Sequence, residues 1–107
     1  MRLLALLLLL AAPAAFAEPY AGPGVETCRA YAQADLKRYG ESGTVSFVAD
    51  ESLEIDKYTR KAGRQFVSSV LTGHGRIADP KGKALEQAFV CLLADDKHAV
   101  FFWWLPR

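Results

Sequence analysis

The chain has 107 residues, of which 51% are hydrophobic and 23% are charged, and its 13 Lys and Arg nearly balance its 12 Asp and Glu. Nucleic acid is excluded as a partner, because neutralising phosphates requires clustered Lys and Arg. The densest basic stretch, residues 57–64, is interrupted by uncharged residues.

The first 17 residues have the pattern of a secretory signal peptide of bacterial type. Arg2 precedes a leucine-rich apolar run, and the small-residue triplet at positions 15–17 predicts cleavage after Ala17. The run ends at Pro13 and is shorter than the ~20 apolar residues of a spanning helix, so no membrane span is expected after cleavage. A periplasmic or secreted protein is therefore predicted, with an uncleaved anchor as the alternative.

Removing this leader leaves a flexible lead-in over residues 18–24, rich in Pro and Gly, and one small domain over residues 25–107. In an oxidising compartment Cys28 and Cys91 are expected to pair as a disulfide. Closing so long a loop stabilises a small domain by roughly 4 kcal/mol in the chain-entropy model. Two buried free thiols are the alternative.

Apolar residues recur at three- and four-residue spacing from Val25 through Cys28, Ala32 and Leu36 to Tyr39. This period predicts an amphipathic helix that ends at Gly40 with a left-handed cap. Cys28 lies on the apolar stripe, so its thiol should point at whatever the helix packs against.

Beyond Gly43 the helical period is replaced by short runs rich in β-branched and aromatic residues, which predict strands. A turn is expected over residues 79–82 and a hairpin loop over residues 95–97. The expected strands span residues 44–49, 53–58, 65–72, 84–94 and 98–105, with a short segment over residues 76–78 after the third of them. The predicted fold is α+β, with one N-terminal amphipathic helix packed on a four- to five-stranded antiparallel meander and held by one disulfide.

The last hairpin allows two registers. With a loop of two or four residues, Phe89, Cys91 and Leu93 share the helix-facing side with Val100, Phe102 and Trp104. The opposite face then carries apolar residues only: Val90, Leu92, Phe101, Trp103 and Leu105. A three-residue loop exchanges the partners and turns Phe101 and Trp103 towards the helix.

In either register the sheet is apolar on both faces near its C-terminus, and one helix covers only one of them. Curling of the sheet into a barrel would bury the second face. Otherwise that face stays exposed, as contiguous apolar surface commonly does at a partner or ligand site.

Little else in the sequence points to chemistry. The glycines around His74 fit two alternatives: a tight loop that presents the imidazole at the rim of the apolar face, or a bulge or bend at Gly73 and Gly75 without a function. His98, Asp95 and Asp96 could complete a metal site with His74, but their spacing matches no metal motif, so neither a metal nor another cofactor is expected. No GxSxG motif is present and both cysteines are assigned to the disulfide, so an enzyme is not expected.

The sequence thus predicts a small exported binding protein without catalytic activity. The binding residues would be Phe101, Trp103, Leu105, Val90 and Leu92, with His74 beside them, and the partner a protein or an apolar ligand. A structural envelope protein that homodimerises through the same face is the alternative, and a small enzyme is a remote one.

The overall form is similar to small periplasmic proteins that include inhibitors of secreted hydrolases. The helix laid across an antiparallel sheet is similar to the cystatin-like architecture. A likeness of architecture implies no particular function.

Overall fold

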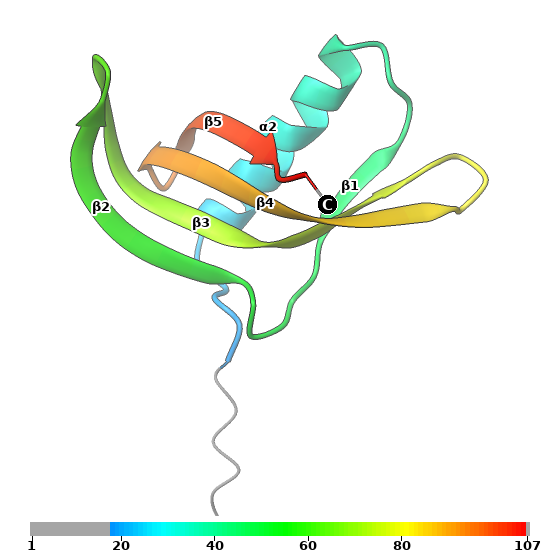
Figure 1. Ribbon diagram of the computed structural model, residues 1–107, viewed down its shortest axis with the longest axis horizontal. Helices are drawn as coiled ribbons and strands as arrows, with labels where there is room; N and C mark the ends of the chain where they lie inside the picture. The colour runs from blue at the N-terminus through cyan, green and yellow to red at the C-terminus, as the bar shows by residue number, and fades with distance from the viewer. Residues whose placement is uncertain (1–17, 107) are drawn as a thin grey trace, which may run out of the picture.

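The computed structural model describes residues 18–106, and within them one helix packs on an open five-stranded antiparallel sheet (Figure 1). The elements in chain order are α2 (Gly24–Arg38), β1 (Thr44–Phe47), β2 (Glu54–Ala62), β3 (Gln65–Ala78), β4 (Ala84–Asp95) and β5 (His98–Trp104). The predicted α+β class is confirmed, and the sheet does not close into a barrel. The predicted signal peptide lies outside the described residues.

Helix α2 ends as its sequence predicts. Gly40 adopts a left-handed conformation with φ of 73°, its N–H donates to the Lys37 carbonyl, and the Glu41 N–H donates to the Leu36 carbonyl. This pair of bonds is a Schellman motif, which satisfies carbonyls that the helix end would leave unpaired. Within residues 18–106 no helix has the length and hydrophobicity needed to cross a membrane.

The strand order departs from a simple meander at β1. The order is β1-β3-β4-β5, and β2 also pairs with β3. Because β3 is 14 residues long, two strands pair with the same edge of it. Strand β2 pairs along residues 65–72 of β3, and β1 pairs along residues 75–78. The side chain of Gln33 fastens β1 to the helix by donating to the Gly43 carbonyl and accepting from the Val45 N–H.

The expected loop around His74 is wrong, because β3 runs through it without a break. The two flanking glycines are explained by packing instead. A Cβ on Gly73 would lie 2.9 Å from Leu53 Cδ1, and one on Gly75 would lie 2.8 Å from the ring of Trp104. These glycines therefore make room on the core face of β3 for two large side chains.

The core lies between α2 and the inner face of the sheet. Cys28 and Cys91 form the predicted disulfide across this layer, with Cα atoms 6.2 Å apart, and both residues are fully buried. The rings of Phe47 and Phe102 both stack against Phe89, with centroids 4.2 and 5.2 Å from it, and lie 6.0 Å from each other. The remaining buried members of this core are Ala32, Leu36, Val45, Leu53, Leu71 and Leu93.

The last hairpin turns at Asp96 and Lys97, so the even-loop register is confirmed and the three-residue alternative is wrong. Cys91 lies opposite Phe102 on the helix side, and Val90 lies opposite Trp103 on the other side. One detail differs, because Leu93 pairs with Ala99 rather than Val100. Irregularities in the register near the turn cause this exchange.

Candidate functional site

Nine residues form a continuous three-by-three arrangement on the face of the sheet that points away from α2, here called the outer face. The register places three cross-strand rows side by side: Val70, Leu92 and Phe101; then Thr72, Val90 and Trp103; then His74, Ala88 and Leu105. Alternation along each strand sends their side chains to the same side. The three rows span roughly 10 by 13 Å between Cα positions, from the strand spacing and rise.

The outer face brings together all six residues predicted as a binding site. Trp103 is 59% exposed, and Phe101 and Leu105 are 38% and 39% exposed. The rings of Phe101 and Trp103 lie 5.9 Å apart at 59° to one another. Val90 and Leu92 are half-buried between these side chains and β3. The outer face therefore consists of half-buried aliphatic side chains on β4 beside more exposed aromatic side chains on β5.

Sequence reasoning missed Val70, Thr72 and Ala88, which complete the outer face. Their contribution depends on the β3–β4 register, in which Val70 meets Leu92 and Thr72 meets Val90. The available signal was the turn over residues 79–82, where the Gly82 N–H donates to the Asp79 carbonyl and the two strands begin to pair. The expected loop around His74 ended the predicted strand at residue 72, so this register was not extended to Val70 and Thr72.

His74 lies at a corner of the outer face, and a hydrogen-bond chain holds its ring there. Ser52 Oγ donates to Asp50 Oδ1 and lies 3.1 Å from His74 Nδ1. The pKa of Asp50 is lowered, first by the Ser52 hydroxyl and then by the Ser52 N–H. Since the serine proton is committed to the carboxylate, His74 Nδ1–H is the donor to Ser52.

This Asp50–Ser52–His74 chain does not have the order that activates a serine nucleophile. General-base activation places histidine between the serine and the carboxylate, so that the imidazole removes the hydroxyl proton. Here the serine is the middle member and already donates to Asp50. The arrangement instead holds the imidazole in one orientation at the edge of the outer face.

The two histidines lie far apart. His74 is opposite Ala88 and His98 is opposite Asp95, seven positions further along β4, a separation of roughly 23 Å at the usual strand rise. Within residues 18–106 no three His, Cys, Asp or Glu side chains gather as a metal site would require. His98 Nδ1 bonds to Asp95 at 2.8 Å, which is a contact within the last hairpin.

Charged residues border the outer face on two sides. On the β2 side, the exposed residues Glu54 and Asp56 lie opposite Thr72 and Val70. Beyond the His74 row, Arg76 and Glu86 face each other across β3 and β4, with Arg76 Nε 3.1 Å from Glu86 Oε1. Within the described residues 18–106, the side formed by β5 carries no such charged border.

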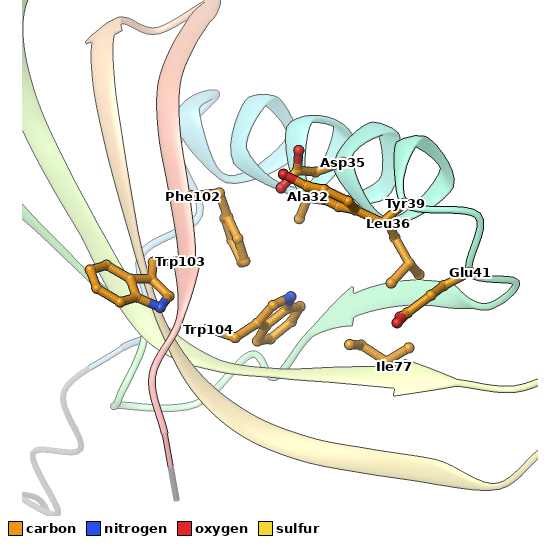
Figure 2. Close-up of a pocket in the computed structure, with 9 residues that line it drawn as sticks. All are labelled: Ala32, Asp35, Leu36, Tyr39, Glu41, Ile77, Phe102, Trp103 and Trp104. Atoms are coloured by element: carbon orange, nitrogen blue, oxygen red, sulfur yellow. The ribbon is translucent and has the colours of Figure 1, made fainter.

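A hollow lies on the helix side of the sheet, between the C-terminal half of α2 and β5 (Figure 2). Its volume is about 370 Å³, and its apolar lining includes Leu36, Ile77 and Trp104. Asp35 lies at this hollow and pairs with Arg38 at 3.3 Å. Trp104 points into the hollow, whereas the indole of Trp103 points away from it (Figure 2). Sequence reasoning did not anticipate this hollow.

Comparison with protein-family models, with characterised proteins and with solved structures finds no match to this chain. The two surfaces are therefore interpreted from their own geometry. The outer face gathers the predicted residues, whereas the hollow belongs to the layer between helix and sheet.

Proposed function

We propose that the mature chain, residues 18–107, is a small exported binding protein without catalytic activity, and that it recognises a partner protein through the outer face. The observation that carries this proposal is the exposure of Trp103 at 59% within a continuous apolar surface. Soluble proteins rarely leave such surface in water unless it serves an interaction. Tryptophan is also among the residues most enriched at the energetic centres of interfaces.

The border of the outer face indicates the chemistry of the partner. Glu54 and Asp56 add two carboxylates beside Thr72 and Val70, whereas the charges of Arg76 and Glu86 offset each other. A complementary partner would place an apolar or aromatic side chain against Trp103 and Phe101, and Lys or Arg beside β2. Such rim charges act mainly on the association rate, and salt weakens their effect.

Two further observations are compatible with export. The disulfide between Cys28 and Cys91 suits an oxidising compartment, and no helix within residues 18–106 spans a membrane.

The test is capture of proteins from an envelope extract of the native cell by immobilised residues 18–107. Trp103→Lys is the disrupting variant. Phe66→Lys is the matched control, because Phe66 is an aromatic residue of β3 with similar exposure, 45%, and lies outside the three rows, six positions along β3 from Thr72. A protein retained by the wild type and by the control, but lost with Trp103→Lys, is the expected result.

The captured protein should then bind purified mature chain with a change in tryptophan fluorescence and with an association rate that falls as salt increases. Identical capture by all three proteins would contradict the proposal. The alternative, a homodimer that buries the outer face, is tested on the mature chain alone. Light scattering would show twice the monomer mass, and the fluorescence of Trp103 would be shielded from a soluble quencher.

A further inference from the structure

The two edges of the sheet differ in how they discourage pairing with another strand. Strand β2 carries Lys57, Arg60 and Lys61, and its register is interrupted next to Thr59, which has a φ of 47°. Charges and bulges of this kind are the usual protection of an exposed edge. Strand β5 has no charged residue between Ala99 and Leu105 and no proline within it. The β2 edge is therefore protected against pairing with another strand, whereas the β5 edge is not.

The free backbone groups of β5 can be assigned from one hydrogen bond. The Leu105 N–H donates to the Ala88 carbonyl at 2.8 Å, which makes this a hydrogen-bonded pair that continues the β4–β5 register. Because such pairs alternate along an antiparallel ladder, the N–H and C=O groups of Trp103 point towards β4. Those of Phe102 and Trp104 point away from β4. Among the described residues, no backbone group outside β4 bonds to β5.

The outer face runs up to this unprotected edge. Its most exposed member, Trp103, lies on β5, whereas charged residues border the face on the β2 side and beyond the His74 row. The apolar surface is therefore bounded by charge on two sides and open towards β5. Whatever pairs with β5 would continue the sheet and extend this surface.

We infer that β5 is a dimer seam, at which two copies of the chain pair their β5 strands antiparallel about a two-fold axis. The occupant suggested by the residues is a second copy, because the edge is complementary to itself. With Trp103 on the axis, the outward groups of Phe102 in each copy meet those of Trp104 in the other. The uncharged stretch brings no like charges together across the seam.

In this register Trp103 faces Trp103 of the second copy in a non-hydrogen-bonded pair, and Phe101 faces Leu105. All of these side chains lie on the outer face, so pairing at the edge joins two outer faces into one larger surface instead of burying them. The inference goes beyond the proposed function and does not depend on it, since the seam would exist whether or not a partner binds.

The test begins with the mass of residues 18–107 by sedimentation, from low micromolar to submillimolar concentration. The expected result is a reversible shift from the monomer mass to twice that mass. Amide exchange followed by NMR then identifies the seam. The amides of Phe102 and Trp104 should exchange freely in dilute protein and become protected in the dimer, whereas the amide of Trp103, bonded to β4, should be protected in both.

Two variants sharpen the measurement. Phe101→Lys places a charge at the seam and should raise the dimer dissociation constant by about tenfold or more, because charges on an edge oppose strand pairing. Phe66→Lys should leave that constant unchanged. Trp103→Cys should form a disulfide-linked dimer on mild oxidation, because non-hydrogen-bonded pairs bring Cα atoms to about 4.5 Å, within the range of a disulfide.

A chain that remains monomeric at submillimolar concentration would overturn the inference. So would a dimer in which the Phe102 and Trp104 amides exchange as freely as in the monomer, which would indicate face-to-face association. A monomer would leave the proposed function untouched, because that function depends on capture of a partner that Trp103→Lys abolishes. Face-to-face association would instead favour the alternative in which a homodimer buries the outer face.

Discussion

Trp103 and Trp104 are neighbours in β5, yet their indoles lie on opposite faces of the sheet. The Trp104 ring packs edge-on against Phe102 with centroids 4.9 Å apart, on the side of the helix. The Trp103 ring points the other way (Figure 2) and is 59% exposed. Strand alternation thus assigns one tryptophan to the core and the other to the surface.

This division predicts opposite responses to substitution. Trp103→Lys should change the free energy of unfolding by less than about 1 kcal/mol, as surface substitutions usually do. Trp104→Ala should cost about 3 kcal/mol, because it removes a large ring from the core. Urea denaturation of both variants measures the difference. A loss with Trp103→Lys as large as that with Trp104→Ala would assign Trp103 to the core and remove the basis of the outer-face proposal.

A second prediction concerns the close approach of Trp104 to β3. Gly75→Ala would place a Cβ 2.8 Å from the Trp104 ring and 3.2 Å from the Phe47 ring, and such overpacking should destabilise the fold by about 1–3 kcal/mol. In a Trp104→Leu background the same change should cost clearly less, because the ring it meets is gone. Equal costs in the two backgrounds would show that the glycine is needed for another reason.

Much of the fold could be predicted from periodicity because the relevant signals are local. The apolar stripe through Cys28 and Leu36 indicated the helix and the side on which it packs, and Gly40 marked its end. The short polar turn at Asp96 restricted the last hairpin to a few registers. Once the disulfide placed Cys91 under the helix, alternation along β5 assigned Trp103 to the other face.

The features that could not be predicted depend on contacts between distant segments. The glycines beside His74 have the composition of a loop, yet they belong to a continuous strand because Leu53 and Trp104 pack on them. β1 pairs with β3 and not with β2, since β3 is long enough to hold both along one edge. Val70 and Thr72 join the outer face only through the β3–β4 register, and the loop expected around His74 separated them from the turn over residues 79–82 that sets it.

A third prediction concerns acid stability. The pKa of Asp95 is lowered, first by the hydrogen bond from the Lys97 N–H and then by the contact with His98. A carboxyl group whose pKa is lower in the folded state contributes stability that is complete above its unfolded pKa and is lost as pH falls through the folded one. This contribution should therefore be complete at neutral pH and disappear below about pH 4, where aspartate titrates.

Asp95→Asn tests this prediction. Urea midpoints of wild type and variant should differ at neutral pH, with the variant less stable, and the difference should shrink as the pH falls below about 4. Lys97→Ala is the control, since it keeps the backbone N–H that bonds to Asp95 and should retain the pH dependence of the wild type. A difference that stays constant from neutral to acid pH would show that the carboxylate charge has no part in it.

The last prediction concerns the covalent link between helix and sheet. Cys28 and Cys91 are separated by 63 positions, so their disulfide closes most of the domain into one loop. Removing it with Cys91→Ala should cost about 2–5 kcal/mol, as loss of a native disulfide in a small secreted domain typically does. Cys28→Ala and the double variant should lose a similar amount, because the disulfide is already absent in each single variant.

Urea denaturation of the three variants and of reduced wild type measures this loss. The reduced wild type is the informative control, since it lacks the disulfide but keeps both sulfur atoms in the core. It should be more stable than the Ala variants only by the small packing contribution of the two thiols. Titration of unfolded, unreduced wild type should find no reactive thiol. Unchanged stability of Cys91→Ala, together with two titratable thiols, would mean that the cysteines pack against each other without a bond and that the core alone holds α2 on the sheet.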